Sequence, residues 1–236
     1  MKAYKPCRGR MIAAAVCNLL IFAFTVYGMS RFFTVGGDGN MPVMNTRCFQ
    51  YFTVDSNLLA ALASLLLLAY QMRCLGKGEA APKALIALKY VGTVAVSVTF
   101  FTVFCFLGLI YGYRSMIEGV NLFMHLITPL LAMLSFCVLE REPALRFRSV
   151  FLGLIPTAVY GIVYMGMVVA LRRWYDFYGF NIGGHWALSS ILMLLGTWVL
   201  SLALWALRRA LAGRKAPEKA EMYPCFARTI VTIIVT

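Results

Sequence analysis

Two short polar stretches interrupt long apolar runs, and both carry side chains that can do chemistry. In the first, FQYFTVDSNLL, Thr53, Ser56 and Asn57 stand at positions i, i+3 and i+4, so a helix would place them on one face. In the second, NLFMHLITP, Asn121 and His125 form a similar stripe. Burying a hydroxyl and an imidazole costs free energy, and the cost is smallest if they face each other or a water-filled pocket.

A threonine and a histidine that meet can form a nucleophile and its base. The threonine hydroxyl is a weak nucleophile that needs a base, and a neutral imidazole accepts a proton at physiological pH. We therefore predict Thr53 as nucleophile and His125 as base. Asn57, one turn below Thr53, can donate to a developing oxyanion or orient the histidine. The remaining candidates for substrate, oxyanion or orienting contacts are Ser56, Asn121, Asp176 and His185.

Signatures of other hydrolases are missing from the sequence. It contains no Gly-x-Ser-x-Gly and no HExxH, which argues against a serine hydrolase with a nucleophile elbow and against a zinc protease. The seven cysteines never form a CxxC pair. We expect no metal ion and no cofactor.

Composition assigns the chain to the membrane proteins. Of its 236 residues 61% are hydrophobic and 13% charged, and the mean hydropathy is +0.79. A membrane-crossing helix needs about 20 apolar residues, and six such runs are present, at about 11–30, 51–72, 85–112, 119–139, 149–171 and 185–207. We predict an all-α, six-transmembrane-helix bundle over residues 1–212, followed by a tail at 213–236.

Basic residues are distributed unequally between the two ends of these spans. With the amino terminus in the cytoplasm, seventeen of the 22 Lys and Arg residues fall on that side, and such a bias orients helical membrane proteins. We expect both termini in the cytoplasm and basic loops against anionic lipids of the inner leaflet. This accounts for the net charge of +13, so nucleic acid is not an expected partner.

The same topology predicts where the polar residues lie in depth. The second and fourth spans both run inward, so at about 1.5 Å per residue Thr53, Asn57 and His125 lie within about 10 Å of the outer edge. Pro129 cannot donate to the carbonyl of His125, so we expect a bend beside the imidazole. Lys89, near the cytoplasmic end of the third span, is expected to extend its ammonium to the headgroups.

The chain resembles a known family of membrane proteins. The pairing of FTVDSN in the second span with H-x-x-x-P in the fourth, within six helices, resembles the androgen-induced and androgen-dependent TFPI-regulating membrane proteins and their bacterial relatives. The resemblance implies hydrolysis of fatty acid esters of hydroxy fatty acids by a membrane-embedded threonine and histidine, which correspond to Thr53 and His125. The residues after Thr53, Val54-Asp55-Ser56-Asn57, are closer to bacterial members, which implies a bacterial cytoplasmic membrane.

A second function stays open beside the hydrolase. Threonine in a membrane helix most often bonds the carbonyl four residues back, and an intramembrane histidine can serve as a structural hydrogen-bonding group. The same bundle would then be a non-catalytic lipid or small-molecule binding protein, or a transporter.

Overall fold

The computed structural model describes residues 8–34, 44–74, 81–140 and 144–213, and every regular element in these ranges is a helix. Six stretches of helix are long and apolar enough to cross a membrane: Arg8–Phe33, Phe52–Cys74, Lys83–Tyr111, Leu122–Leu139, Ser149–Ala170 and Trp186–Ala212. The prediction of an all-α bundle of six spans is therefore confirmed, with limits that shift by a few residues. Of the tail predicted at 213–236, all but Gly213 lies outside the described residues.

Three of the spans are continuous helices and three are composites. The continuous ones are α1 (Arg8–Phe33), α2 (Phe52–Cys74) and α9 (Trp186–Gly213). The third span joins α3 (Lys83–Thr102), η2 (Val103–Leu107) and α4 (Gly108–Tyr111), and the fourth joins η3 (Leu122–Ile127), α6 (Thr128–Leu134) and η4 (Ser135–Leu139). The fifth joins α7 (Ser149–Leu152), α8 (Ile155–Met165) and η5 (Gly166–Ala170). Short helices η1 (Asn45–Gln50), α5 (Tyr113–Met116) and η6 (Ile182–Gly184) lie in the connections.

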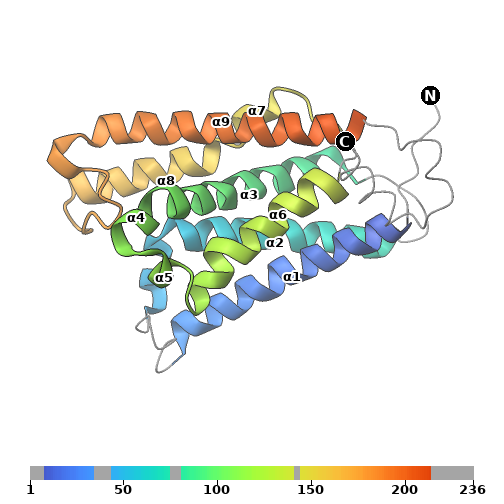
Figure 1. Ribbon diagram of the computed structural model, residues 1–236, viewed down its shortest axis with the longest axis horizontal. Coiled ribbons are helices and arrows are strands. Elements are labelled where there is room, and N and C mark those ends of the chain that lie inside the picture. Colours follow the sequence, from blue (N-terminus) through green and yellow to red (C-terminus); the bar gives the residue numbers. More distant parts are fainter. Residues whose placement is uncertain (1–7, 35–43, 75–80, 141–143, 214–236) are drawn as a thin grey trace.

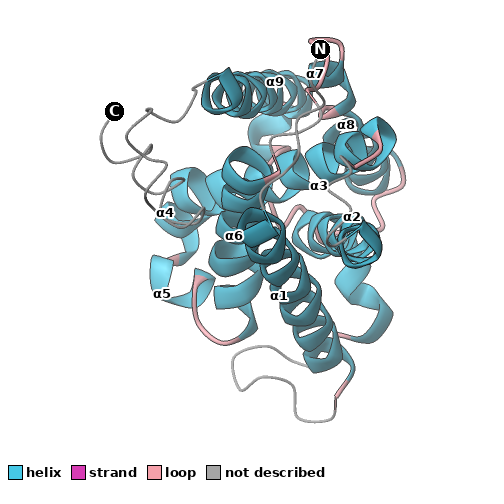
Figure 2. Ribbon diagram, turned by 90° about the vertical axis from the view of Figure 1, so that its right-hand side faces the viewer, coloured by secondary structure: helices cyan, strands magenta, loops and turns pink. Residues whose placement is uncertain are grey.

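Helix α3 lies at the centre of the bundle, where it packs against α2, α6, α8 and α9 (Figure 2). Helix α1 packs on α2 and α6, on the far side from α9 (Figure 1). Helix α2 begins at the end of the bundle drawn on the left of Figure 1, where α4 and α5 also lie. We call this the Thr53 end, and we call the opposite end, where α1 begins and α9 ends, the Lys89 end.

Each composite span contains π-helical turns, namely η2, η3, η4 and η5. A π-helical turn widens the helix and redirects its carbonyls, and such turns are frequent at functional sites. In the fourth span η3 ends one residue before Thr128-Pro129. The bend expected beside His125 therefore takes the form of a wide turn that carries the imidazole.

Most of the buried polar side chains lie in one half of the bundle, formed by α1, α2, α3 and the fourth span. Apolar solvent offers polar groups no partners, so they turn inward and bond to one another. The α8–α9 half is mostly apolar. The buried polar residues of the first half include Asn18, Thr25, Ser56, Asn57, Ser64, Gln71, Lys89, Thr93, Ser97, Thr99, His125, Thr128, Ser135 and Glu140.

The expectation that Lys89 reaches the headgroups is wrong. Its side chain is 1% exposed, and its ammonium donates to Asn18 Oδ1 and to Ser64 Oγ, each at 2.6 Å. Asn18 in turn donates to Glu140 Oε1 at 2.6 Å and to Gln71 Oε1 at 3.1 Å. Inward partners on two other spans therefore hold the lysine, and Asn18 relays between the ammonium and the carboxylate.

This network, which we call the Lys89 network, also reaches α9. The Arg208 guanidinium donates through Nε and Nη2 to the backbone carbonyl of Glu140. Five of the six spans thus meet through buried hydrogen bonds at the Lys89 end. Removing one member of such a buried pair leaves an uncompensated charge, which costs much more than removing both.

We expect Lys89→Met and Glu140→Gln each to destabilise the protein by about 3–5 kcal/mol, because each removes one of two opposite buried charges that Asn18 links. The double variant Lys89→Met/Glu140→Gln should lose clearly less than the sum of the two. The free energy of unfolding in mild detergent, measured as a double-mutant cycle, tests this coupling.

Lys83→Met is the matched control, since Lys83 lies on the same helix with an exposed side chain. Its stability should stay within about 0.5 kcal/mol of wild type. Strict additivity of the two charge removals would contradict the coupling.

Candidate active site

Thr53 and His125 lie beside each other at the Thr53 end. Thr53 is in the first turn of α2, where the helix dipole favours developing negative charge. His125 is in η3 and is 7% exposed. The distance from Thr53 Oγ1 to His125 Nε2 is 3.4 Å, which is a loose hydrogen bond of the kind that nucleophile and base pairs show without ligand.

The other ring nitrogen fixes how the imidazole is protonated. His125 Nδ1 lies 2.6 Å from the backbone carbonyl oxygen of Met116. A carbonyl can only accept, so Nδ1 carries the proton and, in the neutral ring, Nε2 presents its lone pair to the threonine hydroxyl. The Met116 carbonyl thereby fixes the tautomer and orientation of the imidazole, and a backbone carbonyl leaves no trace in a sequence motif.

The turn that carries Met116 is itself tied in place. Gly112 begins it with φ +84, a conformation that glycine adopts without strain. Ser115 Oγ donates to the carbonyls of Tyr111 and Gly112, both at 2.8 Å. Asn121 Nδ2 donates to the carbonyl of Ser115 at 3.0 Å. Asn121 therefore holds the turn that orients His125, and its amide has no bond to Thr53.

Asn57 joins the two helices that carry the pair. Its Nδ2 donates to the Thr53 carbonyl at 2.7 Å and to the Met124 carbonyl at 3.1 Å. Pro129 has no N–H to give to Met124, five residues back in the π-helical register, so Asn57 supplies a donor to that carbonyl. Both amide hydrogens are engaged, which leaves none for an oxyanion. Of the two roles predicted for Asn57, the arrangement favours orientation.

Ser56 faces a different helix from His125. Its hydroxyl lies 2.8 Å from Thr99 Oγ1 on α3 and 3.1 Å from the Thr53 carbonyl. It therefore links the start of α2 to α3 and has no contact with the imidazole.

Asp176 and His185, the two candidates from the connection between α8 and α9, do not join the pair. Asp176 accepts from Tyr164 Oη at 2.8 Å and from the backbone N–H groups of Phe180 and Asn181 at 3.0 and 2.7 Å. Its carboxylate shapes the connection. His185 has an exposed side chain and stands just before α9, and among the described residues no hydrogen bond joins it to Thr53 or His125.

That connection instead contributes Tyr178, which the sequence did not single out. The Phe52 N–H, at the start of α2, donates to Tyr178 Oη at 3.0 Å. Burial raises the pKa of Tyr178 to about 12, so the phenol is protonated at neutral pH. The phenol fills the position of a helix cap and fixes the first turn of α2, from which Thr53 projects.

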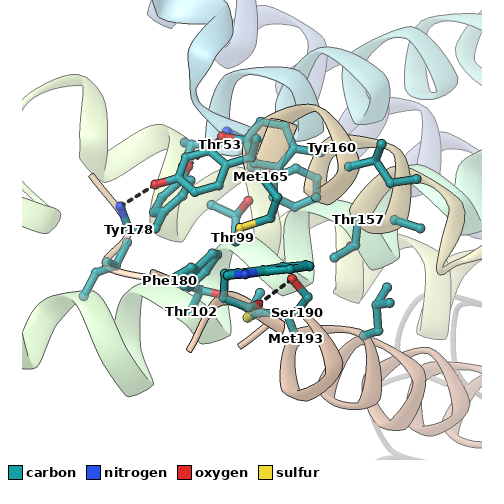
Figure 3. Close-up of a pocket in the computed structure, with 18 of the residues that line it drawn as sticks. Thr53, Thr99, Thr102, Thr157, Tyr160, Met165, Tyr178, Phe180, Ser190 and Met193 are labelled. Atoms are coloured by element: carbon teal, nitrogen blue, oxygen red, sulfur yellow. Dashed lines mark hydrogen bonds between the residues drawn. The ribbon is translucent and has the colours of Figure 1, made fainter. Parts of the chain in front are cut away.

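Thr53 forms part of the wall of a cavity of about 290 Å³ between α2, α3, α8 and α9. Figure 3 shows Thr53 and Tyr160 on one side of the cavity, Met165 and Thr99 near its middle, and Thr102, Phe180, Ser190 and Met193 on the opposite side. The surface is almost wholly apolar and aromatic. It suits a hydrocarbon chain whose polar end lies at Thr53.

The aromatic wall is a second feature that local patterns did not indicate. Tyr160, Tyr164, Tyr178 and Phe180 stack on one another with ring centroids 5.3–6.3 Å apart. Tyr160 also donates to the Gln50 carbonyl at 2.6 Å. These rings therefore pack inward over the candidate site.

Comparison of the chain with protein-family models, curated proteins and solved structures found no match. A functional assignment therefore depends on the geometry of the site.

The geometry predicts one tautomer for His125, with the proton on Nδ1. The chain has two histidines, so His185→Asn leaves His125 as the single imidazole in a protein labelled with ¹⁵N-histidine. At neutral pH the ¹⁵N spectrum should show a protonated Nδ1 and an unprotonated Nε2. A neutral ring protonated on Nε2 would contradict the bond to Met116 and would remove the acceptor for Thr53.

Proposed function

We propose that the protein is a membrane-embedded hydrolase of lipid esters, with Thr53 as nucleophile and His125 as base. The observation that carries this proposal is the order Met116 carbonyl, His125 imidazole, Thr53 hydroxyl, with distances of 2.6 and 3.4 Å. It supplies a nucleophile, an acceptor for its proton, and a group that fixes that acceptor.

The chemistry proceeds in two halves. Thr53 gives its hydroxyl proton to His125 Nε2 as Oγ1 adds to the ester carbonyl, and the tetrahedral intermediate collapses when the alcohol leaves with that proton. The product is an acyl-threonine. A water molecule then gives a proton to Nε2 and attacks the acyl carbonyl, and this second intermediate collapses as the bond to Oγ1 breaks and Nε2 returns the proton to Oγ1. The carboxylic acid and free Thr53 result. The first-turn position of Thr53 in α2 favours the negative charge that develops in both steps.

The cavity supports a fatty acyl ester as the substrate class. Among the described residues its wall contains no charged side chain, and aromatic and aliphatic groups dominate it. Fatty acid esters of hydroxy fatty acids, implied by the family resemblance, belong to this class. The same resemblance supports a bacterial cytoplasmic membrane as the location, with anionic lipids against the basic loops.

A non-catalytic lipid-binding protein, or a transporter, is the second candidate. The apolar cavity favours it as much as it favours an enzyme, because burial of a chain requires no chemistry at Thr53. The two functions differ in whether a covalent acyl-threonine forms.

We expect purified wild-type protein to release fatty acid from acyl esters and to be labelled by a fluorophosphonate probe. Thr53→Ala should abolish labelling and turnover, and His125→Ala should lower kcat by about 10²–10⁴ because the general base is lost. Thr53→Ser should retain labelling, since a serine hydroxyl can take the same place.

Two variants serve as controls. Thr25→Val removes a buried hydroxyl on α1 that bonds only the Ile21 carbonyl, at 2.9 Å, and His185→Asn removes the exposed histidine. Both should keep wild-type turnover. Saturable ligand binding by a wild-type protein that takes no label and releases no acid would refute the enzyme and support the binding protein.

A further inference from the structure

A second hollow lies on the outside of the bundle, next to the cavity. It is a groove of about 840 Å³ between the third span and α9, and we call it the α3–α9 groove. Its lining is uncharged. The residues that form it include Val98, Phe101, Phe106, Leu192, Leu195 and Val199.

The groove opens to the outside of the bundle and lies toward the Thr53 end. Phe101, Leu192, Leu195 and Val199 are 43–57% exposed, and they belong to membrane-spanning helices. Side chains of this kind at this depth are in contact with lipid hydrocarbon. Acyl chains of the bilayer are therefore the molecules available to fill the groove.

The groove and the cavity share a wall. Thr102, Phe180 and Met193 line both. Met193 is an unbranched side chain that changes rotamer easily, and Phe180 is held at one edge by its packing on Tyr178 and Tyr164. The wall between the lipid-facing groove and the cavity lined by Thr53 thus contains one flexible side chain, Met193.

We propose that the α3–α9 groove binds the acyl chain of a membrane-resident ester and delivers its ester group past Met193 to Thr53. The inference rests on the proposed hydrolase function and narrows its substrate class to esters whose acyl chain is longer than the cavity holds. Such a substrate reaches the site sideways from the bilayer, and the surplus chain stays in the groove.

Gly196 offers a direct way to block the groove. It is on α9, lines the groove and not the cavity, and a Cβ added there would meet no atom within 4 Å. A large side chain at this position therefore extends into the groove without displacing the backbone. Glycine favours a helix less than any residue except proline, so the substitution loses no helix propensity. Val199, one turn further along α9, gives a second variant.

The test compares two esters in proteoliposomes, a water-soluble butyrate ester that fits in the cavity and a palmitate ester dissolved in the bilayer. Gly196→Trp should lower kcat/KM for the palmitate ester at least tenfold and leave the butyrate ester within twofold. Val199→Trp should reproduce this difference. Val159→Trp is the matched control, since Val159 is 57% exposed on α8 and lines neither hollow, and both rates should stay unchanged.

A second readout does not depend on turnover. In Thr53→Ala protein, a palmitate ester with a diazirine in its chain should cross-link to residues 98–106 and 189–203, and excess unlabelled ester should compete. Gly196→Trp should remove this competed cross-linking. The proposal would be overturned if both tryptophan variants kept the wild-type ratio of kcat/KM for the palmitate ester to kcat/KM for the butyrate ester. It would also be overturned if cross-linking were unchanged in Gly196→Trp. Failure of wild-type protein to cleave either ester would overturn the hydrolase instead, whatever the cross-linking shows.

Discussion

The candidate site depends on one bond, between His125 Nδ1 and the carbonyl of Met116. It fixes both the orientation and the protonation of the imidazole. Without it, nothing would determine whether Nε2, which lies 3.4 Å from Thr53 Oγ1, donates or accepts a proton. The bond exists because a short helix after Gly112 turns the chain back over the fourth span. Asn121, about one turn before His125, donates to the Ser115 carbonyl of that helix.

The interior is divided according to what each half must bury. Spans α1 and α2, most of α3, and the fourth span enclose amides, hydroxyls and charges, which bond across helices because lipid offers them nothing. The α8–α9 half encloses the aromatic cavity and the groove. Thr53 lies where the halves meet, with His125 on the polar side and hydrocarbon space on the other. An ester has the same two parts, a polar carbonyl and an apolar chain.

Sequence patterns predicted the architecture and part of the candidate site. The six spans followed from apolar length alone, and Thr53 and His125 could be paired because inward-running helices place them at the same depth. Met116 could not be found, since its contribution is a backbone carbonyl. Tyr178 was not among the predicted site residues because its contact with the start of α2 joins segments 126 residues apart. Lys89 was misplaced because its distance from the span end was considered, whereas its acceptors come from α1 and α2.

The residues of the Lys89 network are synthesised in a fixed order. Ribosomes make Asn18 and Ser64 before Lys89, and Glu140 and Arg208 after it. When the third span enters the membrane, the ammonium can already bond to a neutral amide and a hydroxyl, and the carboxylate arrives only with the fourth span. Arg208 arrives last and bonds the Glu140 carbonyl. The Lys89 ammonium thus enters the membrane after its neutral acceptors are in place, and membrane insertion can proceed span by span.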